Sequence, residues 1–301
     1  MQLRILFVLS LFLLLIPPVE AQKKKTEKIA DEETFIQENF RIKVPSRWKP
    51  GERFIYVDSV LNITLKPERP VLHDTTNYLN MPFVFEAFKE RTDWGGNSTL
   101  DLIFRANGQQ YRFETGKSLT QISDTTYNPL IPGLIWLPEI EKADSLLKGK
   151  TLYILTSEWM AEDEASLRNA RKFVPVVITA VEPGNEYAPV NIRFQDQTGA
   201  EFYIRTTLSG TLNSSSRYKF PRIFSFHDPR TKYKEIADET WKLITEGKLA
   251  AGMTQSEVRL SIGKPTNIDR IPTYSGLREQ WLYNSGTMIQ FQDGRITNFR
   301  Q

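Results

Sequence analysis

The stretch from residue 249 to residue 301 constrains the fold more than any other part of this chain, because its helix start and stop signals are regularly spaced. The residues before it, 232–247, place apolar side chains on one helical face. Thr254 and Glu257 have the spacing of a capping box, which begins a second helix, and Gly263 ends that helix. The sequence therefore predicts two consecutive helices.

Three short runs of alternating apolar residues follow these helices. They cover residues 280–283, 287–291 and 295–300. The tripeptides between them, Asn-Ser-Gly and Gln-Asp-Gly, are typical of β-turns. Two helices followed by a three-stranded meander make a compact α+β unit of about 60–70 residues, which is near the lower size limit for independent folding.

The same residues resemble the SmpA/OmlA family, which has the BamE-like fold. The resemblance covers residues 235–301 and depends on the order of five motifs. These are Gly-Met-Thr at 252–254, Glu-Val at 257–258, Gly-Lys-Pro at 263–265, Trp-x-Tyr at 281–283 and Phe-x-x-Gly at 291–294. Family members serve outer-membrane β-barrel assembly, and related folds act as protein-binding or inhibitor domains. The resemblance therefore implies a protein-binding C-terminal domain, residues 223–301.

A repeat of pattern precedes this domain. Residues 82–88 match residues 175–181, which lie 93 positions later, and residues 107–113 match residues 198–204, at an offset of 91. Alternation with glycine turns at this spacing predicts two small SH3-like barrels. One difference is expected between the copies, because residues 158–172 are rich in Ala, Glu, Asp and Arg and predict a helix.

The predicted fold class is mainly β with α+β: two SH3-like β-barrel repeats followed by a C-terminal BamE-like domain of two helices and three strands. We place the first β domain at residues 35–125 and the second at residues 147–222. Residues 126–146 contain several prolines and predict a linker, whose short apolar segment, 134–137, is expected to dock onto a neighbour.

The N-terminus has the features of an export signal. Arg4 precedes an apolar run at 5–16, which is too short to span a bilayer. Two prolines follow, and then Val19-Glu20-Ala21, which fits the small-residue cleavage rule. We interpret residues 1–21 as a signal peptide; an uncleaved anchor is the alternative. Residues 22–34 are lysine-rich and predict a disordered basic leader. Because no second apolar stretch reaches membrane length, we expect a periplasmic or secreted protein without a stable membrane span.

The residue types needed for common catalytic sites are scarce. There is no cysteine, which excludes a thiolate nucleophile, a cysteine metal site and a lipidation site. The two histidines, His73 and His227, are 154 positions apart, and neither has a metal-ligand spacing. No nucleophile elbow, P-loop or dinucleotide motif occurs. The sequence predicts no enzyme activity, no cofactor, no metal and no nucleic-acid partner.

Aromatic residues are the remaining candidates for a binding site. Trp94, Trp136 and Trp159 fall outside the predicted strand cores, and Tyr283 belongs to the C-terminal signature. Exposed Trp and Tyr are typical of protein hot spots and of sugar platforms. The alternative interpretation is that these rings pack the linker and the insert onto the barrels.

These observations favour a non-enzymatic binding or assembly protein of the cell envelope, with an envelope protein as its partner. The alternative is a carbohydrate or cell-wall binding module that holds a glycan or peptidoglycan through its loop tryptophans. A hydrolase would need a shielded pair of carboxylates, whereas the carboxylate-rich stretches of this sequence are polar and solvated in character.

Overall fold

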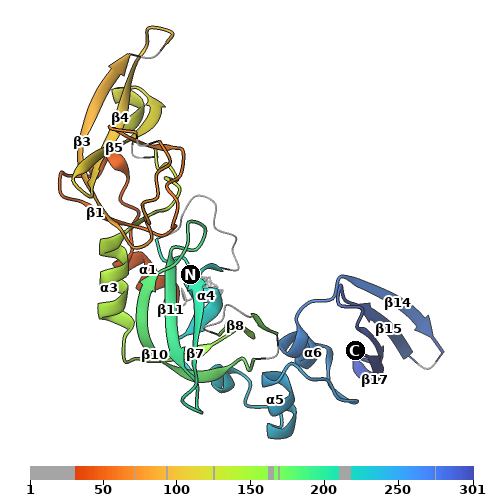
Figure 1. The fold of residues 1–301 in the computed structure, drawn as a ribbon. Helices are drawn as coiled ribbons and strands as arrows, with labels where there is room; N and C mark the ends of the chain where they lie inside the picture. Colours follow the sequence, from red (N-terminus) through yellow and green to blue (C-terminus); the bar gives the residue numbers. More distant parts are fainter. Residues whose placement is uncertain are drawn as a thin grey trace, which may run out of the picture.

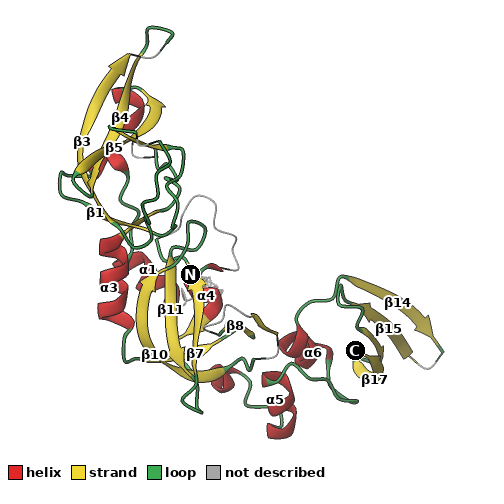
Figure 2. Ribbon diagram, in the orientation of Figure 1, coloured by secondary structure: helices red, strands yellow, loops and turns green. Residues whose placement is uncertain are grey.

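The computed structural model describes residues 31–70, 72–92, 94–124, 126–161, 166–168, 170–209, 218–274 and 276–301. The predicted signal peptide, 1–21, and the leader residues 22–30 lie outside the described residues. Strands take up 39% of the chain and helices 21%, so the protein is mainly β, and its larger sheets are curled into half-barrels. Figures 1 and 2 show three successive lobes, each of which has its own hydrophobic core.

The N-terminal lobe is a six-stranded antiparallel sheet in the order β2-β5-β4-β3-β1-β6. Its elements are η1 (Pro45–Arg47), β1 (Arg53–Tyr56), β2 (Leu65–Pro67), β3 (Pro82–Thr92), β4 (Ser98–Ala106), β5 (Gln109–Lys117), α2 (Leu119–Ser123) and β6 (Leu134–Trp136). Alternate side chains of the strands, such as Phe83 and Phe85 of β3, point to one face and form the core with Tyr56 and Phe104.

The middle lobe is a seven-stranded sheet in the order β13-β7-β10-β11-β12-β8-β9. Its strands are β7 (Thr151–Ile154), β8 (Glu158–Met160), β9 (Ser166–Arg168), β10 (Val174–Pro183), β11 (Val190–Gln195), β12 (Glu201–Thr206) and β13 (Phe224–Ser225). Three helices pack with it: α1 (Asp31–Asn39), α3 (Leu137–Leu147) and α4 (Phe220–Ile223). Figure 1 shows α3 lying along the sheet beside β10.

The two sheets have matching strand orders. The order β6-β1-β3-β4-β5-β2 corresponds to β13-β7-β10-β11-β12-β8, and β9 is an addition at the far edge. In both sheets the long strand contains a bulge, directly after Phe85 in β3 and directly after Ile178 in β10. The carbonyls of these two residues accept hydrogen bonds from Gly51 and Gly149, each at 2.8 Å. The offset of 93 seen in the sequence therefore relates equivalent positions of the two sheets.

The C-terminal lobe contains α5 (Asp238–Thr245), α6 (Gln255–Ile262) and the antiparallel strands β14 (Asn267–Thr273), β15 (Gly276–Leu282), β16 (Met288–Gln292) and β17 (Arg295–Arg300). Short η3 (Pro229–Lys232) connects it to the middle lobe. The predicted capping box is present, because Thr254 and Glu257 exchange hydrogen bonds at the start of α6. The sheet has four strands instead of the three predicted, since β14 pairs along the whole of β15.

The predicted helix over residues 158–172 is wrong. The chain forms strands β8 and β9 there, and residues 162–165 lie outside the described part. Trp159 explains the difference: its ring contacts Phe194 and Phe202 with centroid distances of 5.4 and 5.2 Å. Burial of this large side chain on the sheet outweighs the weak helix preference of its polar neighbours.

The disorder predicted for residues 22–34 is wrong at residues 31–34, because α1 begins at Asp31. The buried carboxylate of Glu32 accepts hydrogen bonds from the Ser225 hydroxyl and the Phe226 amide, both at 2.7 Å. Phe35 packs onto the core of the middle lobe. The start of the described chain therefore belongs to the middle lobe instead of the first β domain predicted at 35–125.

The stretch predicted as a linker, residues 126–146, is ordered structure shared by two lobes. Its first half supplies β6, which pairs with β1, and its second half supplies α3, whose Ile140 and Ala143 are buried in the middle lobe. Arg53 of β1 forms a two-pronged ion pair with Glu141 of α3 at 2.5 and 2.8 Å. The segment thus joins the two sheets directly.

Residues 171–173 attach the C-terminal lobe to the middle lobe. The ring of Phe173 stacks on Trp241 of α5 at a centroid distance of 5.6 Å. The Lys172 amide donates to the Thr245 carbonyl at 3.0 Å, and its side-chain amine donates to the Ser261 carbonyl at 2.5 Å. Burial lowers the pKa of Lys172 to about 8, from an ordinary value of 10.5.

This pKa shift predicts a pH-dependent stability that Lys172→Met should remove. Lys172 keeps its proton up to a higher pH in the unfolded chain than in the folded protein. The free energy of unfolding should therefore rise between about pH 8 and pH 10.5, by up to about 3 kcal/mol. Urea unfolding of wild type and Lys172→Met at both pH values measures this rise. Lys242→Met, at an exposed position of α5, is the control, and an equal effect of both substitutions would contradict the prediction.

Candidate interaction site

The β3–β4 hairpin carries the most exposed tryptophan of the described chain. The two strands pair from Val84 with Arg105 to Thr92 with Ser98, and Figure 1 shows the hairpin extending away from the other lobes. Trp94 lies in the connecting turn with a relative exposure of 105%. A fully exposed indole is unusual on a soluble surface, because it leaves a large apolar area in water. The turn is therefore the first candidate for a contact surface.

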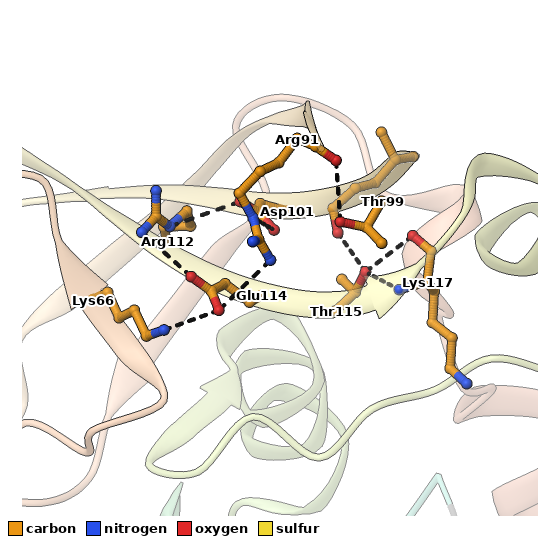
Figure 3. Close-up of polar contacts among 9 residues, drawn as sticks. Lys66, Arg91, Thr99, Asp101, Arg112, Glu114, Thr115 and Lys117 are labelled. Atoms are coloured by element: carbon orange, nitrogen blue, oxygen red, sulfur yellow. Dashed lines mark hydrogen bonds and ion pairs between the residues drawn. The ribbon is translucent and has the colours of Figure 1, made fainter. Parts of the chain in front are cut away.

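An ion-pair network crosses the sheet in the half of this hairpin that lies nearer its turn (Figure 3). At its centre is Asp101 of β4, which is 1% exposed and lies 3.0 Å from the Arg91 guanidinium of β3 and 3.7 Å from that of Arg112 in β5. Glu114 of β5 extends the network to Arg112 at 3.3 Å and to Lys66 of β2 at 2.9 Å. These contacts connect four adjacent strands of one sheet.

The charges in the network reinforce one another. The hydrogen bond from Lys66 holds the pKa of Glu114 below its usual range, assisted by the nearby guanidinium groups of Arg91 and Arg112. A buried carboxylate such as Asp101 is stable only when cations or donors surround it, and here two arginines do so. The network therefore opposes separation of β3 from β4 at the point where the hairpin leaves the apolar core.

Threonine hydroxyls add a second set of contacts at the same level (Figure 3). The Thr99 hydroxyl donates to the Arg91 carbonyl at 3.2 Å, and the Thr115 hydroxyl donates to the Leu100 carbonyl. Thr115 also accepts a hydrogen bond from the Lys117 amide at 3.0 Å. A register shift between β4 and β5 occurs here, and these hydroxyls satisfy the backbone around it. Near the turn of the hairpin, β4 is thus held to both of its neighbouring strands, β3 and β5.

Trp136 occupies a different environment. It is half-buried in β6, its indole N–H donates to Glu52 at 3.0 Å, and the Lys43 amine lies 5.5 Å from the ring centroid. Burial alone would raise the pKa of Glu52, but hydrogen bonds from Lys43 and Trp136 lower it below its usual value. The ring therefore belongs to a polar cluster at the junction of the N-terminal and middle lobes, where it also lines a small cavity.

The other two predicted binding residues are core residues. Trp159 is 4% exposed in the middle lobe, and its indole N–H donates to the Thr156 carbonyl at 2.9 Å. Tyr283 is 8% exposed, its hydroxyl donates to the Gly263 carbonyl at 3.1 Å, and burial raises its pKa to about 12. Neither ring presents a face to a partner. The four predicted residues are spread over three lobes and do not form one site.

The structure brings together the polar side chains of His227 and Asp31, a contact that the sequence does not reveal. The His227 ring lies 2.6 Å from Asp31, a residue 196 positions earlier, and both side chains are exposed. Ser225 is nearby, but its hydroxyl donates to Glu32, while the contact from His227 to this hydroxyl comes from the backbone amide. This arrangement joins α1 to the segment after β13 and lacks the serine–imidazole bond of a nucleophile and its base.

The ion-pair network was also missed by sequence reasoning, although a signal for it was present. Asp101 interrupts an otherwise apolar run in residues 100–104, and a charge at such a position indicates a buried partner of opposite sign. Its partners Arg91 and Arg112 come from neighbouring strands, so they depend on strand register, which the pattern alone leaves open.

No group of three or more His, Asp or Glu side chains in the described part of the chain is arranged to hold a metal ion. The helices placed by the structure are too short or too polar to cross a bilayer.

Comparison with protein-family models, with curated proteins and with solved structures found no match. The resemblance of residues 235–301 to the SmpA/OmlA family therefore stays a prediction.

The network predicts that Asp101→Asn will destabilise the N-terminal lobe. Loss of the buried charge leaves the guanidinium groups of Arg91 and Arg112 with Glu114 but without the buried carboxylate between them, which should lower the free energy of unfolding by about 1–3 kcal/mol. The exposed partner provides the control, since Lys66→Gln should cost less than about 1 kcal/mol. Urea unfolding combined with amide hydrogen exchange in β3 and β4 measures both, and equal costs would refute the central role of Asp101.

Proposed function

We propose that this protein is an exported, non-enzymatic binding or assembly protein of the cell envelope, and that Trp94 is its main contact with a protein partner. The observation that carries the proposal is the full exposure of Trp94 at the end of a hairpin. The network around Asp101 supports it, because a contact held rigid before binding loses less entropy when the complex forms.

The architecture supports the role of a scaffold. We propose that the two curled sheets are copies of one SH3-like unit, based on their matching strand order and bulges. We further propose that the C-terminal lobe is BamE-like, with β14 as an additional strand, because the predicted helix cap and helix order are present. Folds of both kinds are used to bind proteins, although fold alone does not identify a partner.

A protein partner is favoured over a glycan by the placement of the tryptophans. Sugar platforms need exposed aromatic faces, whereas Trp159 is buried and Trp136 is half-buried with its indole N–H used by Glu52. A single indole at the tip of a projecting turn instead resembles the anchor residue of a protein–protein contact.

Trp94→Ala should reduce recovery of the partner at least about tenfold, since anchor residues contribute more than about 1.4 kcal/mol. Affinity capture from envelope extracts, with quantitative mass spectrometry of the captured proteins, measures this. Tyr274→Ala is the matched control, because Tyr274 is equally exposed, at 115%, on the hairpin between β14 and β15.

Three results would overturn the proposal, two from this capture and one from a separate sedimentation assay. These are a loss that is equal for both variants, a capture without any reproducible protein, and sedimentation with purified peptidoglycan that depends on Trp94. The last result would establish the cell-wall alternative.

Export predicts a mature chain that begins at Gln22. Mass spectrometry of the protein recovered from the periplasmic fraction should show this new N-terminus, because the small residues before it fit signal peptidase cleavage. Substitution of the apolar run by charged residues should retain the protein inside the cell. An intact chain starting at Met1 in the cytosol of unmodified cells would disprove the export part of the proposal.

A further inference from the structure

A small cavity lies at the junction of the N-terminal and middle lobes. Its volume is about 130 Å³, and its walls include the rings of Trp48, Trp136 and Tyr187. Tyr187, from the loop between β10 and β11, is 63% exposed at the rim. Binding sites for drug-sized ligands are several times larger, so this cavity has the size for one amino-acid side chain.

Two carboxylates line the same cavity, Glu139 of α3 and Glu186 of the β10–β11 loop. Glu139 accepts hydrogen bonds from the amide and the hydroxyl of Ser209 at 2.8 and 2.9 Å. Each of its oxygens keeps a further acceptor position, and burial raises its pKa above the usual range. Within the described chain neither carboxylate forms an ion pair.

The one cationic side chain in the described lining of the cavity already has a partner. Lys43 lines the cavity, but its amine forms an ion pair with Glu52, a residue outside the lining. Lys43 also lies 5.5 Å from the centroid of the Trp136 ring, which shows that this aromatic wall is compatible with a positive charge. Among the described residues, the cavity thus combines aromatic walls with two carboxyl groups that form no ion pair.

We propose that this cavity binds the side chain of an arginine from a partner protein, with its guanidinium group between the aromatic walls and the carboxylates of Glu139 and Glu186. A planar guanidinium stacks on aromatic rings and pairs with carboxylates through several N–H groups. An apolar side chain would leave the remaining acceptor positions of Glu139 without a donor. A lysine amine is more strongly hydrated and cannot form the same paired hydrogen bonds.

The occupied cavity links two lobes. Trp48 and Trp136 come from the N-terminal lobe, whereas Glu139, Glu186 and Tyr187 come from α3 and the middle lobe. An arginine bound between them contacts both sides of the junction, so it opposes their separation. This site is independent of Trp94, which lies at the far end of the β3–β4 hairpin.

The test uses the full mature chain labelled with ¹⁵N and the indole N–H signals of its tryptophans, assigned by Trp→Phe substitutions. The probe is Nα-acetyl-arginine N-methylamide, and its neutral isostere, the citrulline compound, is the control. We expect a saturable shift of the Trp136 indole signal with the arginine probe, with a Kd on the order of 1 mM, and at least about tenfold weaker binding of citrulline.

Glu139→Gln should weaken arginine binding about tenfold, whereas Glu141→Gln, on the same helix but paired with Arg53, should change it less than about twofold. Trp94→Ala should leave arginine binding unchanged, so the test of this cavity is separate from the test of the proposed function. The inference is overturned if wild type shows no saturable shift, if citrulline binds as well as arginine, or if Glu141→Gln weakens binding as much as Glu139→Gln. If Glu139→Gln fails to fold, the comparison of the arginine and citrulline probes on wild type still tests whether the cavity prefers a guanidinium group.

Discussion

The pairing of β3 with β4 is the contact on which the N-terminal lobe and its candidate site both depend. In its lower half, Phe85 and Phe104 face the apolar core, and this burial holds the strands together. In its upper half, Arg91 and Asp101 replace the core with an ion pair shielded by neighbouring strands. The hairpin can therefore extend past the core and still keep its shape, and Trp94 reaches solvent as a result.

Bulges give the two sheets their curvature. A bulge adds a residue to one strand and increases the local twist, so a sheet with a bulge in its longest strand bends around its own apolar face. β3 and β10 have this feature at equivalent positions. Each sheet can then enclose a core with few helices, which leaves its edges and turns available for contacts between lobes. The first two lobes are joined by β6, which pairs with β1 at the edge of one sheet, and by α3, which packs on the core of the other.

Several structural features could be predicted because they depend on neighbours in the sequence. The cap at Thr254 and the alternation in β3 are local, as a helix start needs residues three apart and a strand face needs residues two apart. The insert at residues 158–172 could not be predicted in the same way. Its helix-favouring composition was outweighed by the packing of Trp159, which depends on β11 and β12.

The candidate sites show the same division. By itself, the sequence determined the residue types available: no cysteine, two histidines and six tryptophans, as well as a repeat with an offset of 93. Only the tertiary structure decided that Trp94 is exposed, that Trp159 is buried and that Glu139 shares a cavity with Trp136. The physical reason is that exposure and proximity depend on how strands pair and lobes pack, and those contacts join residues far apart in the chain.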